Sequence, residues 1–159
     1  MFEKTVAALE KRGFEAVAVA TGKEALELVL EEAGKAGSVG WGGSETLKEI
    51  GVRDAIAAAG KEIRDHQLEM DLFLLSANAL TSDGRIVNID GRGNRVAASI
   101  AGPKRVVYVI GRNKIVEGRY QQAVRRIKQV ACPQNARRLG LDTPCASLGR
   151  CDAANCRKS

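Results

Sequence analysis

Residues 88–98, NIDGRGNRVAA, bring asparagine, aspartate, glycine and arginine together between strongly apolar stretches of the chain. A carboxylate can move a proton, an arginine can hold an anion, and a glycine lets the backbone approach a ligand closely. Similar residues follow other apolar runs, at Gly42-Gly43-Ser44, at Asn78 and at Asn113-Lys114. Ligands in parallel sheets bind beyond the carboxyl ends of the strands, so we expect these stretches to converge on one site.

Each candidate residue has a role that suits its chemistry. Asp83, Asp90 and Lys114 are the candidates for catalysis, because the carboxylates could transfer protons or orient the loops and the lysine could hold an anionic substrate. The backbone N–H groups of the loop at residues 42–44, ahead of a helix, could cradle a phosphate or carboxylate. The ligand-binding candidates are Gly42, Gly43, Ser44, Asn78, Asn88, Gly91, Asn94, Arg95 and Asn113.

The same residues also suit ordinary turns and helix caps. Asp83-Gly84 and Asp90-Gly91 are favourable turn pairs, and Ser44 is a good N-cap after a tight turn. The Gly-Gly-Ser loop is neither a Walker motif nor a dinucleotide-binding fingerprint. Spacing alone therefore supports a binding site and a plain scaffold about equally.

All four cysteines fall in the last 28 residues, at Cys132, Cys145, Cys151 and Cys156. Clustered cysteines in a cytoplasmic protein are more typical of metal binding or redox chemistry than of disulfides. The tail TPCASLGRCDAANCRKS predicts Cys145, Cys151 and Cys156 as ligands of zinc or of an iron–sulfur cluster. Their spacing matches neither the paired zinc motif nor the ferredoxin motif, so a tail that binds no metal stays open as the alternative.

The composition is that of one globular domain, with 159 residues, of which 45% are hydrophobic and 28% charged. The sequence has no apolar run long enough to span a membrane, and its first residues lack the apolar stretch of a signal peptide. A cytoplasmic protein is therefore expected. Residues 103–159 hold 13 Lys and Arg against 3 Asp and Glu, a net charge of +10. This basic third could attract an anionic partner or be solvated surface. Aromatic residues are only 4%, which disfavours nucleic-acid binding by base stacking.

Alternating apolar and amphipathic segments predict an α/β fold with a mainly parallel sheet flanked by helices. We expect strands at 14–20, 37–41, 71–77, 85–89 and 104–111, and helices at 2–12, 24–33, 45–50, 94–101 and 117–131. Thr21 and Glu24 form a capping box for the second helix, and Tyr120 is expected to face inward from the last. Residues 51–70 show no clear pattern. They include the only histidine, His66, so no Ser/His/Asp triad can be argued.

The motifs GWGGSETLKEIG, LTSDGRIVNIDGRGNRVAASIAGPKRVVYVIGRNKIV, ACPQNARRLG and TPCASLGRC together resemble the LUD-domain family, of the lactate utilisation protein C type. The resemblance implies the fold of the NagB/RpiA/CoA transferase-like superfamily. It also implies a link to the oxidation of L-lactate to pyruvate, beside partner subunits that carry iron–sulfur clusters or flavin. Residues 76–91 resemble the methylthioribose-phosphate isomerases too, where an aspartate acting as acid occupies the place of Asn78. An amide cannot supply that proton, so isomerase chemistry is not expected.

We therefore expect a LUD α/β domain at residues 1–140 and a cysteine-containing tail at 141–159. The leading hypothesis is a protein of lactate oxidation that binds a small anionic metabolite at the strand ends. The alternative is a non-catalytic assembly or metal-binding subunit that docks an iron–sulfur redox partner. The sequence leaves open whether the chain forms a homo-oligomer.

Overall fold

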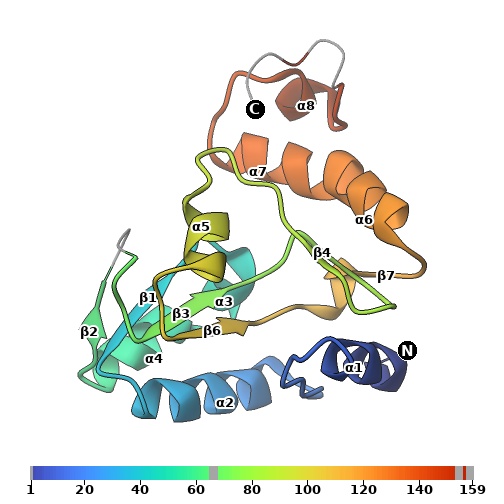
Figure 1. Ribbon diagram of the computed structural model, residues 1–159. Helices are drawn as coiled ribbons and strands as arrows, with labels where there is room; N and C mark the ends of the chain where they lie inside the picture. The colour runs from blue at the N-terminus through green and yellow to red at the C-terminus, as the bar shows by residue number, and fades with distance from the viewer. Residues whose placement is uncertain (1, 65–67, 153–155, 157–159) are drawn as a thin grey trace. The chain divides into compact units, whose positions relative to one another are not determined.

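The computed structural model describes residues 2–64, 68–152 and 156, and the chain divides into two compact units (Figure 1). Unit 1 comprises residues 1–16, 78–91 and 114–159, and unit 2 comprises residues 17–77 and 92–113. His66 lies outside the described residues. No helix within the described ranges is long and apolar enough to cross a membrane.

Unit 2 is built around sheet A, in which the strands run parallel in the order β2-β1-β3-β6. The strands are Ser38–Trp41 (β1), Glu62–Ile63 (β2), Leu72–Leu75 (β3) and Arg105–Tyr108 (β6). Leu72 pairs with Val39 on one side and with Arg105 on the other. The predicted α/β class with a mainly parallel sheet is therefore confirmed.

Strand β3 is covered on both faces, and all its residues are buried. The helices of this unit are Gly22–Gly34 (α2), Glu45–Glu49 (α3), Val52–Ala58 (α4) and Asn94–Ile100 (α5). Leu72 and Leu74 belong to the core that includes residues of α2, α3 and α4, whereas Phe73 packs with Ala98 of α5. Because side chains alternate along a strand, the apolar run at 71–77 reflects burial between two layers of helices.

The predicted Thr21 cap of α2 is confirmed, whereas the Glu24 side chain bonds the N–H of Ala20 and not that of Thr21 as in a full capping box. Thr21 Oγ1 accepts a hydrogen bond from the Glu24 N–H at 3.2 Å, and the Glu24 carboxylate accepts one from the Ala20 N–H at 2.9 Å. The Thr21 bond satisfies an N–H group of the first turn that has no partner within the helix, and the Ala20 bond fixes the chain just before it.

Unit 1 contains sheet B, with the strand order β5-β4-β7. The strands are Ala79–Thr81 (β4), Ile86–Val87 (β5) and Ile115–Val116 (β7). β4 pairs antiparallel with β5 across the predicted turn at Asp83-Gly84, so the two strands form a hairpin, and β4 pairs parallel with β7. Ala79 packs against Ala123 and Ile127, and sheets this small need such cover to be stable.

Helical segments make up most of the rest of unit 1. They are Phe2–Glu10 (α1), Tyr120–Arg126 (α6), the π-helical segment Ile127–Ala131, Cys132–Arg138 (α7) and Pro144–Leu148 (α8), and a 3₁₀ turn at Arg112–Lys114 leads into β7. The chain turns at Gly140, where φ is +63°, close to the predicted boundary between domain and tail. After that turn α8 packs against α7, so the segment that holds Cys145 is folded.

Three predicted segments differ from the structure. Residues 14–20 form no strand, and Val17 is 72% exposed, because alternation without a neighbouring strand and a covering layer does not make a sheet. Residues 51–70 contain α4 and β2, neither of which was predicted. The last long helix begins at Tyr120, whose side chain is 52% exposed rather than inward, and helical structure continues to Arg138.

The turn of the β4–β5 hairpin gives a stability prediction. Gly84 has φ +82°, and a Cβ there would lie 2.7 Å from the Ala8 carbonyl group. Gly60 also has positive φ, +68°, but a Cβ there would meet nothing within 4 Å. Alanine in the left-handed region should cost about 1–2 kcal/mol at either position. The clash should add about 1–3 kcal/mol in Gly84→Ala alone. Urea denaturation of the two variants measures the difference, and equal losses would contradict the close approach of α1 to the hairpin.

Candidate functional site

Three predicted residues, Gly42, Gly43 and Ser44, lie beyond the carboxyl end of β1. The Gly42 N–H donates to the Leu74 carbonyl oxygen at 3.0 Å, so it extends the sheet. Ser44 is the N-cap of α3, since its Oγ accepts from the Leu47 N–H at 3.3 Å. A Cβ at Gly43 would meet nothing within 4 Å, so this position is open. The Ser44 hydroxyl hydrogen and the Gly43 backbone are thus the parts of this loop that suit a ligand.

Arg95 lies across the same end of sheet A. Its Nη1 donates to the Ser76 carbonyl oxygen, just after β3, at 3.2 Å. A Cβ at Gly42 would lie 2.6 Å from Arg95 Cγ, so the glycine leaves room for the arginine stem. Within unit 2, the structure therefore brings the predicted arginine and the predicted glycine loop together.

Two predicted asparagines also belong to unit 2. Asn94 is the first residue of α5 and is exposed, after Gly93 in the left-handed region. Asn113 follows β6, and its Oδ1 lies 2.8 Å from where a Cβ of Gly111 would be. Both residues thus lie on segments that border the carboxyl end of sheet A, as expected for an α/β fold.

In unit 1, Asn78 and Asn88 close the open end of the β4–β5 hairpin. The Asn78 N–H donates to Asn88 Oδ1, and the Ile89 N–H donates to Asn78 Oδ1, each at 2.9 Å. Asp90 and Gly91 follow Ile89 directly in the chain. Lys114 precedes β7, and the pairing of Leu80 with Ile115 sets it beside the start of β4. This edge of sheet B therefore gathers Asn78, Asn88 and Lys114.

Arg126, which the sequence did not single out, belongs to the same edge. From α6 its Nη1 donates to the Asn78 carbonyl oxygen, and burial lowers the pKa of its guanidinium. Its position in the helical pattern could have identified it. Arg126 lies three residues after the buried Ala123 and beside Ile127, at the border of the apolar face. We name these four residues, Asn78, Asn88, Lys114 and Arg126, the hairpin-edge cluster.

Asp83 lies at the other end of the hairpin. Its carboxylate accepts hydrogen bonds from Thr81 Oγ1 and from Arg85 Nε, the latter at 3.1 Å. The Thr81 hydrogen bond, followed by the charge of Arg85, lowers the pKa of Asp83. The predicted convergence of Asp83 with Asn78 and Asn88 is not observed, because the length of the hairpin separates them.

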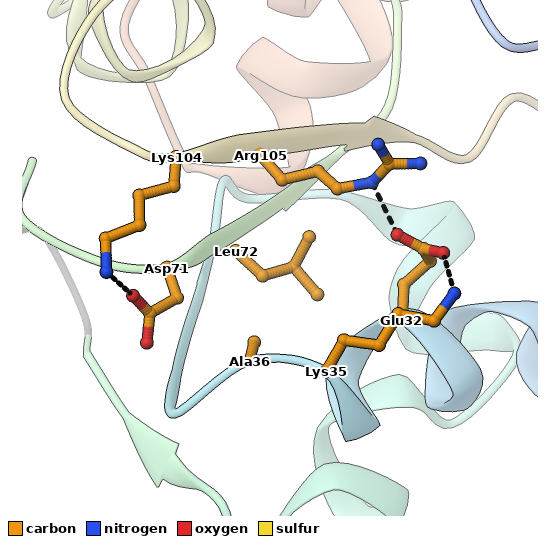
Figure 2. A pocket seen from close by; sticks show the side chains of 7 residues that line it. All are labelled: Glu32, Lys35, Ala36, Asp71, Leu72, Lys104 and Arg105. Carbon is orange, nitrogen blue, oxygen red and sulfur yellow. Dashed lines mark hydrogen bonds and ion pairs between the residues drawn. The ribbon is translucent and has the colours of Figure 1, made fainter.

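A cavity of about 520 Å³ lies at the opposite, amino end of sheet A (Figure 2). Its lining residues are Glu32, Lys35, Ala36, Asp71, Leu72, Lys104 and Arg105. Figure 2 shows Lys35 and Arg105 turned toward Glu32, and Lys104 toward Asp71. The sequence did not predict this cavity. Its charged side chains form ion pairs, and the pair of Glu32 with Arg105 connects α2 to sheet A. These residues therefore stabilise the packing of α2 on the sheet and do not suggest a ligand site.

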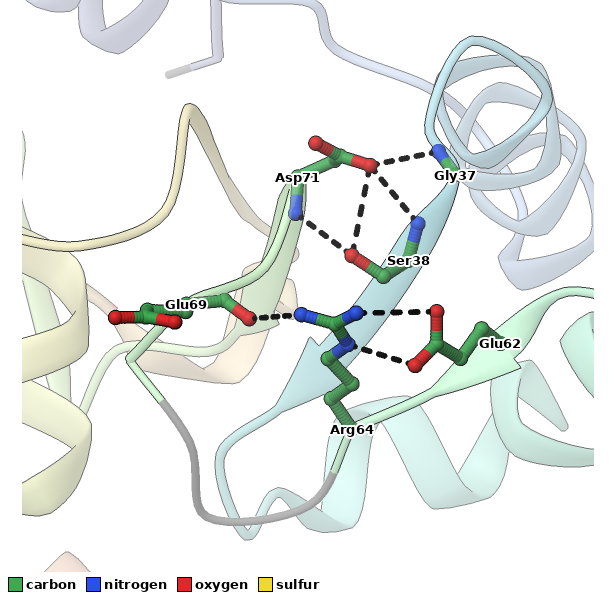
Figure 3. Close-up of polar contacts among 6 residues, drawn as sticks. All are labelled: Gly37, Ser38, Glu62, Arg64, Glu69 and Asp71. Carbon is green, nitrogen blue, oxygen red and sulfur yellow. Dashed lines mark hydrogen bonds and ion pairs between the residues drawn. The ribbon is translucent and has the colours of Figure 1, made fainter.

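Asp71 anchors the start of β3 to the start of β1 (Figure 3). Its Oδ2 accepts from the N–H groups of Gly37 and Ser38, at 2.9 and 3.0 Å, and its own N–H donates to Ser38 Oγ at 3.1 Å. The Lys104 ammonium, 2.6 Å from Oδ1, and then the two backbone N–H groups lower the pKa of Asp71 to about 2. Beside it, Arg64 binds the Glu62 carboxylate and the Glu69 carbonyl oxygen, which ties β2 to the segment before β3.

The four cysteines all belong to unit 1 and are free thiols. Cys145 is buried, and the other three are partly buried. Burial raises the pKa of the Cys132 thiol, and the nearby Cys151, Cys145 and Cys156 act in the same direction. Among the described residues, no group of three or more His, Cys, Asp or Glu side chains is placed to hold a metal ion. The ligand set Cys145, Cys151 and Cys156 therefore stays a prediction.

In a comparison with known families, the family model described as the LUD domain matches residues 2–159. Neither the comparison with curated proteins nor that with solved structures gave a match.

The Asp71 anchor gives a prediction about pH. Its folded pKa is about 2 against an ordinary value of 3.8, so its contribution to stability is complete above pH 4 and is lost as the pH falls toward 2. Asp71→Asn should lower the urea midpoint at pH 7, and the gap to the wild type should narrow between pH 4 and pH 2. Glu27→Gln, which removes an exposed carboxylate 4.0 Å from Lys23, is the control and should change little. A gap that stays constant with pH would contradict this role for the Asp71 charge.

Proposed function

Because the chain belongs to the LUD domain family, we propose that it acts in the cytoplasm in the oxidation of L-lactate and binds a small anionic metabolite. The association of this family with lactate utilisation supports the pathway. The proposed ligand residues follow the carboxyl ends of β1, β3 and β6 in the chain, where α/β proteins place their ligands. A small carboxylate such as lactate or pyruvate suits arginine and lysine side chains in such a position.

The observation that carries the proposal is the hairpin-edge cluster. Arg126 is partly buried and donates from Nη1 to the Asn78 carbonyl oxygen, so a guanidinium group that could bind an anion lies at this edge of sheet B. Lys114 adds a second cation beside the start of β4. Asn88 Oδ1 accepts from the Asn78 N–H and Asn78 Oδ1 accepts from the Ile89 N–H, and these bonds hold the open end of the hairpin at this edge.

The end of sheet A offers a further cation in unit 2. Arg95 is partly buried against Ser76 and Gly42, which restricts the conformations of its stem. The Ser44 hydroxyl group and the open Gly43 backbone are the neighbouring donors. We propose Arg95 as an anion-binding residue of unit 2, taken by itself.

The two aspartates receive different roles in this proposal. Asp83 stabilises the hairpin turn, since Thr81 and Arg85 hold its carboxylate. Asp90 follows the hairpin on the side of Asn78 and is the carboxylate that would orient the loop or transfer a proton.

The cations can be tested by titrating the purified protein with L-lactate and with pyruvate in a calorimeter. Lys114→Ala and Arg126→Gln should each raise Kd roughly tenfold or more, because each removes a charge-assisted hydrogen bond. Arg125→Gln is the control, because Arg125 lies one residue away on α6 with an exposed side chain. Arg95→Ala, titrated in parallel, tests unit 2. Unchanged affinity in the folded Lys114, Arg126 and Arg95 variants would overturn the proposal.

The alternative is a non-catalytic subunit that docks an iron–sulfur or flavin partner. The net charge of +10 over residues 103–159 and the four cysteines there favour it. An assay of the isolated chain with L-lactate and an artificial electron acceptor separates the two functions. Turnover would contradict the docking subunit. Without turnover, a stable complex with a redox partner that is lost when the tail cysteines are replaced would support it.

A further inference from the structure

We propose that Cys132 and Cys151 form a reversible disulfide bond, a redox switch that ties the C-terminal segment to α7. Cys132 is the first residue of α7, and Cys151 follows α8. Both are partly buried free thiols of unit 1. Disulfides in cytoplasmic proteins are usually transient, and they are catalytic or sense redox conditions. This inference requires no metal ion and is independent of anion binding at the hairpin-edge cluster.

The helix that carries Cys132 is interrupted at this point. The Cys132 N–H donates to the Ile127 carbonyl oxygen, a π-helical bond, instead of to that of Lys128. The next residue, Pro133, has no N–H to donate. Within residues 120–138, all of which the structure describes, the Lys128 carbonyl oxygen is therefore left without a helical partner.

Cys151 supplies that partner from outside the helix. Its N–H donates to the Lys128 carbonyl oxygen at 2.9 Å. In helical geometry that oxygen lies about 3–4 Å from the Cys132 nitrogen, so the two cysteine nitrogens are no more than about 7 Å apart. Cysteines that are joined by a disulfide have Cα atoms about 4.4–6.8 Å apart. The hydrogen bond thus places the two backbones at a separation that suits a disulfide.

The side chain of Cys132 extends toward the same turn of the helix. Cα–Cβ bonds in a helix tilt toward its N-terminus, so a side chain covers the turn before its own Cα. For Cys132 that turn contains Lys128, to which the Cys151 backbone is bonded. Segments of π-helix are rare and frequently occur at functional sites. Here the π-helical turn provides the acceptor that holds the chain at Cys151 beside Cys132.

The fold between the two cysteines directs the chain back to this turn. Arg137 Nε donates to the Ala146 carbonyl oxygen at 2.7 Å, which holds α8 against α7. Gly149, at φ +72°, then ends α8 and turns the chain toward Cys151. The pair therefore closes a folded segment, so its formation requires little movement of the backbone.

Cys145 is a competing thiol on α8 itself. Its side chain is buried, and its Sγ lies 3.3 Å from Thr143 Oγ1, within hydrogen-bond distance. Burial limits the access of an oxidant to a thiol. We therefore expect Cys145 to stay reduced while Cys132 and Cys151 react.

The reaction uses hydrogen peroxide as the oxidant. Peroxide oxidises one thiol of the pair to a sulfenic acid, and a water molecule is released. The other thiol attacks that sulfur, so that the S–S bond forms as the S–O bond breaks and a second water leaves. Two thiols and one peroxide thus give one disulfide and two waters. A dithiol reductant reverses the reaction and is itself oxidised to a disulfide.

The test is a thiol map of the full chain, purified with a reductant and then treated with hydrogen peroxide in the presence of a metal chelator. Alkylation and tryptic digestion should show that two of the four thiols are lost. The expected disulfide joins peptide 129–137, which holds Cys132, to peptide 151–157, which holds Cys151 and Cys156. Peptide 139–150, which holds Cys145, should be alkylated. A dithiol should restore all four thiols.

Two serine variants identify the partner of Cys132. Cys156→Ser is the control and should keep the disulfide, whereas Cys151→Ser should lose it. In the folded wild type the expected pair should exceed every other pairing roughly tenfold, because other pairs require the chain to move before disulfide geometry is reached. In urea this preference should disappear.

Several outcomes would overturn the proposal. They are a folded wild type that keeps all four thiols in peroxide, sulfinic acid at Cys132 or Cys151 without a disulfide, and pairing of Cys132 with Cys145 or Cys156. If Cys151→Ser fails to fold, the wild type and Cys156→Ser still decide the question. A disulfide from peptide 129–137 to peptide 151–157 in Cys156→Ser can come only from Cys151.

Discussion

Strand β3 must bury four consecutive apolar side chains, and it can do so only between two layers of helices. Leu72 and Leu74 pack toward α2, α3 and α4, and Phe73 packs toward α5. Parallel pairing fixes the neighbours of β3 in the sheet. The Asp71 carboxylate, just before β3, joins the start of this strand to the start of β1. Because the strand is held at its amino end in this way, the position of the backbone just beyond its carboxyl end is also fixed. Arg95 binds this backbone directly, because its Nη1 donates to the Ser76 carbonyl oxygen.

The parts of the fold that could be predicted are those in which local sequence and tertiary environment agree. The run at 71–77 is apolar on both faces and became β3, and Thr21 with Glu24 started α2 as their side chains allow. Residues 14–20 have the alternation of a strand but no partner in the sheet, which no local pattern reveals. The continuation of the last helix past Pro133 was also hidden, because proline normally ends a helix and only the π-helical turn accommodates it here.

The candidate site shows the same division between local and tertiary information. Asparagine and glycine at strand ends were visible in the sequence, and within each unit they follow or border the ends of strands. Whether they bind a ligand depends on neighbouring groups in the fold, and the spacing of residues in the sequence does not show which groups those are. Arg126 looked like one of many surface cations of a helix, yet it is partly buried and donates to the Asn78 carbonyl oxygen. Asp83 looked like a candidate acid, yet its hydrogen bonds serve a turn. For both residues, the role depends on burial or on a hydrogen-bond partner that the surrounding sequence does not reveal.

The π-helical turn at Ile127–Ala131 also restricts how this gene can change in length. Each residue of an α-helix turns the chain by about 100°. Losing the extra residue of this turn would rotate everything after it by that angle and bring Pro133 and Ala136 out of their buried positions. Loops absorb insertions and deletions at small cost, but this helix cannot. The number of residues from Ile127 to Ala136 should therefore be invariant among related sequences, even where the residues themselves differ.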